Sequence, residues 1–221
     1  MPGKVAVNRI RLGIFALPAA QILILAGDLL LPEFGALSDT AAYAEAVTST
    51  KYQVVAGAYM LGDTLYLFGV FALYAFLVGG PGERWGLAGV ILVVLWLVSN
   101  VIYFGSIAST EPTLGYQYLE GNKEAFIQYE STPFTDAVFF VLDWFIYAGI
   151  LLLGVGIWRS RTLPQGAIIL GIAWVILAPI AYGVSANLTL VTDLLMVIAA
   201  GWIAWVVWRQ LSPAGARSRV R

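Results

Sequence analysis

Long apolar runs dominate this sequence and restrict the folds that it can adopt. A helix needs about 20 apolar residues to cross the hydrocarbon core of a bilayer. Only 11% of the residues are charged, whereas a soluble domain has about a quarter. The pattern therefore predicts one all-α polytopic membrane domain, 1–221. Its six transmembrane helices are expected at about residues 12–31, 53–79, 85–107, 134–158, 165–184 and 188–209.

The first apolar run could also be a signal peptide, because Lys4, Arg9 and Arg11 precede it. The run is about 18 residues long, which exceeds a typical signal-peptide core, and no clear A-x-A cleavage site follows it. We interpret it as a helix that is retained.

The positions of Lys and Arg predict the orientation of the helices, since cytoplasmic loops are enriched in both. Ten of the twelve basic residues precede the first helix, lie in the two short connections or follow the sixth helix. The two longer connections, 32–53 and 109–133, carry only Lys51 and Lys123 against seven acidic residues. Both termini are therefore expected in the cytoplasm and two acidic loops outside. The basic C-terminal tail suits anionic lipid headgroups, and we expect no nucleic-acid partner.

The two outer connections have local helical signals. DTAAYAEAVTSTK in the first could form a short surface helix, and NKEAFIQYE in the second begins with an Asn suited to a helix N-cap. Loops of this length are often lids, although solvated connectors are equally compatible with the pattern.

Polar side chains recur at one depth in five of the six predicted helices. Each lies sixteen or seventeen residues from the basic edge of its helix, or from Gly80 in the second helix. At 1.5 Å per residue, this depth is about 24–26 Å above the cytoplasmic edge of a core about 30 Å thick. The five residues are Asp28, Asp63, Asn100, Asp143 and Asp193.

No Lys or Arg lies within the predicted spans to neutralise these acids. A charged Asp facing lipid costs about 2.5–3.5 kcal/mol at the helix centre, so such acids usually face a cavity or a partner. Either they are protonated, or they share protons, or a cationic ligand supplies the missing charge. Three tyrosines share helix faces with the acids and could complete a hydrogen-bond network: Tyr59, Tyr66 and Tyr147.

The chain contains neither Cys nor His. This composition removes thiolate chemistry, the commonest metal ligand and the commonest general base. Leu61-Gly62-Asp63 is faintly similar to the Gly-Asp motif of intramembrane aspartyl proteases, but the companion motifs are missing. We therefore expect no catalytic residue, no metal site and no cofactor.

Two helical hairpins resemble each other at an offset of 80 residues. Asp63 and Gly69 match Asp143 and Gly149, and the helices that follow match Trp96 with Trp174 at an offset of 78. A parallel duplication would explain these identities, and chance in apolar sequence is the alternative.

The segment FVLDWFIYAGILLLGVGIWRSRTLPQGAIILGIAWVILAP resembles the C-terminal half of a broad group of bacterial six-helix membrane proteins of unknown function. Trp158-Arg159-Ser160 and Leu163-Pro164 carry the resemblance, which is clearest over residues 139–180, while Gln165 departs from the pattern. The resemblance implies a bacterial inner membrane and brings no activity.

Two functions from different classes fit these observations. In the first, the layer of acids lines an outward-facing polar cavity that binds a small molecule, lipid or cation, as in a transporter or sensor. In the second, the acids only bond neighbouring helices, and the protein is a non-catalytic structural or accessory subunit of a larger membrane complex.

Overall fold

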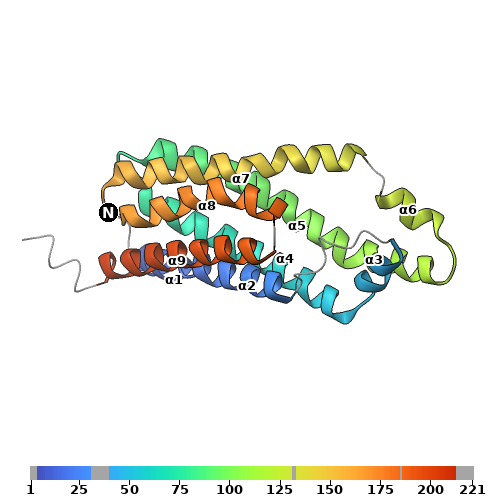
Figure 1. The fold of residues 1–221 in the computed structure, drawn as a ribbon. Coiled ribbons are helices and arrows are strands. Elements are labelled where there is room, and N and C mark those ends of the chain that lie inside the picture. Colours follow the sequence, from blue (N-terminus) through green and yellow to red (C-terminus); the bar gives the residue numbers. More distant parts are fainter. Residues whose placement is uncertain (1–3, 31–39, 131–132, 185, 213–221) are drawn as a thin grey trace, which may run out of the picture.

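The computed structural model describes residues 4–30, 40–130, 133–184 and 186–212, and Figure 1 shows their arrangement. These residues form helices joined by short turns and contain no strand. The helices are α1 (Lys4–Gly13), α2 (Ala16–Leu30), α3 (Thr40–Val47), α4 (Thr50–Leu77), α5 (Glu83–Leu119), α6 (Glu124–Glu130), α7 (Pro133–Ser160), α8 (Gln165–Val184) and α9 (Ala186–Gln210).

Five helical stretches are long and apolar enough to cross a membrane: Ala6–Leu30, Thr50–Leu77, Glu83–Leu119, Phe140–Ser160 and Asn187–Gln210. Gln165–Ala181 in α8 is also apolar but shorter. The chain is therefore an all-helical, multi-pass membrane protein. The first of these stretches contains α1 and α2, which a turn at residues 14–15 separates.

Six helices form a closed ring. In chain order α2, α4, α5, α7, α8 and α9 each pack against the next one, and α9 returns to pack against α2. Short turns at residues 78–82 and 161–164 make α4 and α5, and α7 and α8, antiparallel neighbours. The ring turns one face of each of the six helices toward a common centre, where the main core cluster lies.

The closest helix contact joins α5 to α7 through glycine. A Cβ atom added to Gly82 would lie 2.0 Å from the carbonyl oxygen of Gly156, and one added to Gly89 would lie 2.7 Å from that of Gly149. Backbones come this near only where side chains are absent, as at many helix contacts in membranes. Any larger residue at these four positions would push the two helices apart.

The helix predicted at 85–107 is longer than expected, because α5 runs to Leu119. Its 37 residues span about 55 Å, well beyond a hydrocarbon core of about 30 Å. Ser109 and Thr113 hydroxyls donate to carbonyl oxygens one turn earlier, so their polar groups are satisfied within the helix. The predicted end at 107 is wrong, whereas the short helices expected in the two outer connections are confirmed as α3 and α6.

The projecting part of α5 forms a small outer domain with α3 and α6, which we call the cap (Figure 1). A second hydrophobic cluster, separate from the ring core, holds it together. Its buried members are Ala44, Val47, Tyr52, Ala56, Ile107 and Phe126.

Basic and tryptophan side chains pair at the other end of the ring. The Arg11 guanidinium lies 4.0 Å from the centre of a Trp208 ring, and Arg159 lies 5.5 Å from Trp85. The first and last described residues are at this same end (Figure 1). The pairs therefore tie α1 to α9 and α5 to α7 where the chain begins and ends.

Candidate functional site

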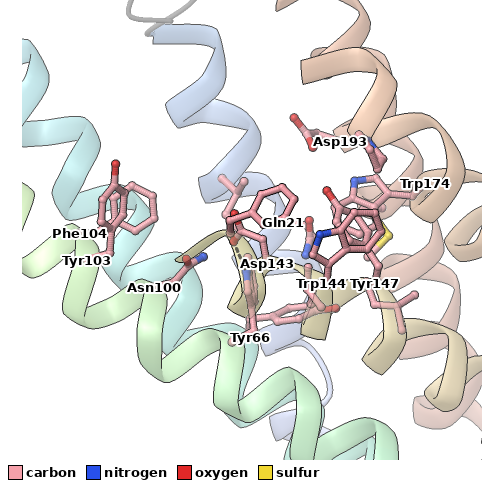
Figure 2. A pocket seen from close by; sticks show the side chains of 17 residues that line it. Gln21, Tyr66, Asn100, Tyr103, Phe104, Asp143, Trp144, Tyr147, Trp174 and Asp193 are labelled. Carbon is pink, nitrogen blue, oxygen red and sulfur yellow. Dashed lines mark hydrogen bonds between the residues drawn. The ribbon is translucent and has the colours of Figure 1, made fainter. Parts of the chain in front are cut away.

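A cavity of about 470 Å³ lies inside the ring. All six ring helices contribute to its wall, and Figure 2 shows their side chains entering one space. The polar residues of the lining are Gln21 from α2, Asn100 from α5, Asp143 from α7 and Asp193 from α9. A ring with one helix fewer would leave this cavity open on one side.

The predicted site residues divide into two groups. Five of the eight line the cavity: Tyr66, Asn100, Asp143, Tyr147 and Asp193. The other three lie behind this lining and contact members of it or one another: Asp28, Tyr59 and Asp63. The carboxylates that the sequence placed at one depth thus come together around one space.

Asp143 lies where the cavity opens along α7. Its side chain is exposed, as are those of Phe140 and Trp144, which also line the cavity. The Trp96 indole N–H donates a hydrogen bond of 3.1 Å to Asp143 Oδ1 across the α5–α7 contact (Figure 2). Asp143 is therefore held in place from one side and accessible from the other.

Asp193 faces Asp28 across the contact between α9 and α2, close enough for the two carboxyl groups to interact. Tyr59 donates a hydrogen bond to Asp28, and its ring stacks on Phe104 at 4.7 Å. Gly27 makes room for this tyrosine, since a Cβ there would lie 2.9 Å from Tyr59 Cζ. Tyr59 therefore bonds an acid of the neighbouring helix α2.

Asp63 is almost fully buried, with 2% of its surface exposed. Its carboxylate lies within hydrogen-bonding reach of Asn100, which lines the cavity. Asp63 is thus separated from the cavity by one polar side chain and stands behind it as a support for Asn100.

Several of these acids have a carboxylate oxygen without a hydrogen-bond partner among the described residues. These atoms are Oδ2 of Asp28, of Asp63 and of Asp193. A buried polar atom that makes no hydrogen bond costs about 1–3 kcal/mol. Asp193 is 3% exposed and lines the cavity, and its carboxyl group lies beside that of Asp28.

Aromatic rings make up much of the remaining wall. Eight of the seventeen lining residues are aromatic, and none is Lys or Arg. Tyr147 connects two of them, with its ring 5.7 Å from that of Trp144 and 5.4 Å from that of Trp174. The eight are Tyr66, Trp96, Tyr103, Phe104, Phe140, Trp144, Tyr147 and Trp174.

Sequence reasoning did not assign Gln21, Trp96, Trp144 or Trp174 to a site. Gln21 had a usable signal, because it is a lone amide within an apolar run. Trp96 and Trp174 were noted only as matching positions of the repeat, yet each lies beside a carboxylate, Trp96 bonded to Asp143 and Trp174 near Asp193. Trp144 had no distinguishing signal.

A second acidic site lies in the cap. Glu111 is 5% exposed, and its Oε2 accepts hydrogen bonds from Tyr52 at 2.5 Å and from Tyr43 at 3.0 Å. Burial raises the pKa of Tyr43, so its hydroxyl keeps the proton that it donates. The sequence had placed Glu111 among the acids of an exposed loop, and the extension of α5 buries it instead.

The described residues contain no ligand set for a metal ion, because no three of their His, Cys, Asp or Glu side chains are grouped to hold one. The cavity lining offers two carboxylates, two amides and aromatic faces. This set suits a charged organic group better than a bare divalent cation, which prefers six or more oxygen ligands.

No family model, curated protein or solved structure matches this chain. The resemblance over residues 139–180 therefore stays a prediction, and the function has to be argued from the cavity itself.

Proposed function

We propose that this protein is an integral membrane protein that binds a small organic cation in its central cavity. The observation that carries the proposal is the composition of the wall, in which two carboxylates and eight aromatic rings line one space and no Lys or Arg is among the described lining residues. Such a wall attracts positive charge through the carboxylates and through the electron-rich faces of the rings.

A bound cation would also remove the cost of the unpaired acids. Asp193 lines the cavity and has one buried oxygen without a hydrogen-bond partner among the described residues, and Asp143 accepts a hydrogen bond from Trp96 with one oxygen. An ammonium group between them would supply the charge that the helices lack, since charged groups within membranes pair with one another or with a ligand. Binding of a cation by the aromatic rings alone, without a carboxylate, would be weaker.

The membrane arrangement that we propose has six spans, with both termini in the cytoplasm and the cavity toward the outside. All 20 residues of α8 together span about 30 Å, which matches the hydrocarbon core. The end that carries Arg11, Arg159 and Arg209 would lie inside, as the positive-inside rule expects. The setting would be the bacterial inner membrane that the family resemblance implies.

The direct test is a binding titration on protein in phospholipid nanodiscs. Tetramethylammonium serves as the cation and tert-butanol as a neutral molecule of similar shape, both measured by calorimetry against empty nanodiscs. We expect saturable binding of the cation only. Equal binding of both probes, or of neither by a folded protein, would overturn the proposal and leave a structural or accessory subunit.

Variants locate the site. Asp193→Asn and Asp143→Asn should each weaken cation binding about tenfold or more, because each replaces one of the two acids that line the cavity with a neutral amide. Glu111→Gln, which neutralises a buried acid outside the cavity, is the matched control and should leave the affinity unchanged. Unaltered affinity in both Asp variants would contradict the assignment.

Tryptophan provides a second, charge-neutral test. Trp144 and Trp158 lie on the same helix and are each 55% exposed, but only Trp144 lines the cavity. Trp144→Leu should weaken tetramethylammonium binding several-fold, and Trp158→Leu should not. Equal effects of the two substitutions would indicate a general change in the protein and count against the cavity.

A further inference from the structure

A second, apolar chamber of about 70 Å³ adjoins the cavity deeper in the ring. Two carboxylates and two amides belong to the first cavity, whereas Tyr66 is the only residue with a polar side chain in the wall of the second. Three residues line both spaces and form the neck between them: Tyr66, Ile150 and Met196. A molecule that occupied both spaces would need a polar end and an apolar end.

The two chambers follow the depth of the membrane. The deeper chamber is lined by residues nearer the end with the Arg–Trp pairs, among them Leu17, Ile157 and Ile203. Asp143 lies sixteen residues from Arg159, or about 24 Å along the helix. The charged chamber thus lies in the outer part of the hydrocarbon core, and the apolar one lies deeper among the acyl chains.

The first cavity opens along α7, toward the side of the helix ring. Phe140 and Trp144 line this cavity, and their side chains are 64% and 55% exposed at the outer surface of α7. A molecule in the outer leaflet would meet this opening from the side, and its polar end would have to move a few ångström inward from the headgroup region to reach Asp143. Entry from the side would not require it to cross the bilayer.

From these observations we propose that the natural ligand is a single-chain cationic amphiphile, whose ammonium group occupies the cavity beside Asp143 and Asp193 while its alkyl chain enters the apolar chamber. This inference rests on the proposed function and specifies the class of ligand. The neck would hold the first carbons of the chain between Tyr66, Ile150 and Met196.

A series of alkyltrimethylammonium ions tests the inference on the full chain in nanodiscs. Butyltrimethylammonium adds three methylene groups to tetramethylammonium, and each buried methylene strengthens binding about fourfold. We expect the butyl compound to bind about tenfold to sixtyfold more tightly, after subtraction of partitioning into empty nanodiscs. The octyl compound should bring little further gain, because the apolar chamber has a volume of only about 70 Å³. If tetramethylammonium binds and longer chains bring no gain, the inference fails and the proposed function stands. If tetramethylammonium does not bind, the proposed function fails as well.

Blocking the apolar chamber separates the chain from the headgroup. Gly171 lines that chamber, and a Cβ added there meets only Ile150 Cγ2 at an ordinary 3.6 Å, so Gly171→Leu directs its larger side chain into the space. This variant should lose most of the gain from the butyl chain and keep its affinity for tetramethylammonium. Gly201→Leu is the matched control, because no atom lies within 4 Å of a Cβ at that position.

A second substitution keeps the test decisive if Gly171→Leu does not fold. Ala200→Leu fills the same chamber from α9 and should have the same selective effect. A chain-length gain that survives either folded variant unchanged would overturn the placement of the chain.

Discussion

Buried acids occur both in the cap and around the central cavity, but their hydrogen bonding differs between the two regions. In the cap, the buried acid Glu111 accepts hydrogen bonds from two tyrosines, both from other helices. In the ring, Asp28, Asp63 and Asp193 each retain an oxygen without a partner among the described residues. One oxygen of the acid in the cap thus accepts two hydrogen bonds, whereas each of these three acids in the ring has a buried oxygen that accepts none from the described residues.

Under the proposed function, this difference separates acids that stabilise the fold from acids that bind a ligand. A buried carboxylate that is fully bonded stabilises its surroundings, and removing it leaves its donors unpaired. An incompletely bonded carboxylate beside a cavity lowers stability until something fills the space. If this distinction is right, substitutions of the acids should have different effects in the two regions.

The largest effect is expected in the cap. Glu111→Ala would leave the Tyr43 and Tyr52 hydroxyls without their acceptor and should lower the free energy of unfolding by about 2–4 kcal/mol. Denaturant unfolding of the purified protein measures this change. Glu111→Gln keeps a carbonyl acceptor and should cost less than half as much; equal losses would show that charge, and not hydrogen bonding, holds the cap.

Asp193→Asn should have the opposite profile. Its effect on cation binding is about tenfold, or about 1.4 kcal/mol, while the free energy of unfolding should stay the same or rise, because the substitution relieves an unpaired carboxylate oxygen. Paired measurements of unfolding and tetramethylammonium affinity on one sample test both parts. A loss of stability as large as that of Glu111→Ala would remove the distinction between the two regions.

Tyr59→Phe probes the support behind the cavity. It removes the hydroxyl that donates to Asp28 and keeps the ring that stacks on Phe104. We expect a loss of about 1 kcal/mol in the free energy of unfolding, typical of one hydrogen bond. Tyr116→Phe is a suitable control, because its hydroxyl donates to the Thr48 carbonyl at an exposed position and should matter less.

The smallest effect is expected for Trp96→Phe. Asp143 is exposed, so water can replace the indole N–H that the substitution removes, and the free energy of unfolding should change by less than about 1 kcal/mol. Thermal unfolding gives this value. A larger loss would mean that Asp143 depends on the protein as strongly as Glu111 does.

The features that follow the bilayer were predictable from the sequence. Apolar runs of about 20 residues are a direct consequence of membrane thickness, and counting from Arg159 and Arg209 was sufficient to place Asp143 and Asp193 at one height. Their meeting in one cavity then needed only a ring of helices. Which helices adjoin was not readable, because an apolar helix surface carries no mark of its neighbour.

The cap was only partly predictable. Its short helices α3 and α6 had capping and composition signals, but the extension of α5 was missed because Ser109, Glu111 and Pro112 read as a loop. The burial of Glu111 depends on Tyr43 and Tyr52, 68 and 59 residues away in the chain. No local pattern encodes such a contact.

The closure of the ring by α9 against α2 also has a consequence for synthesis. During synthesis α2 is made early, whereas α9, which carries Asp193, is made only when most of the chain is complete. Until then Asp28 and Gln21 stand at an open seam that lipid or a membrane chaperone must cover. A chain truncated before residue 186 would keep five of the six ring helices and leave a permanent gap in the wall of the cavity.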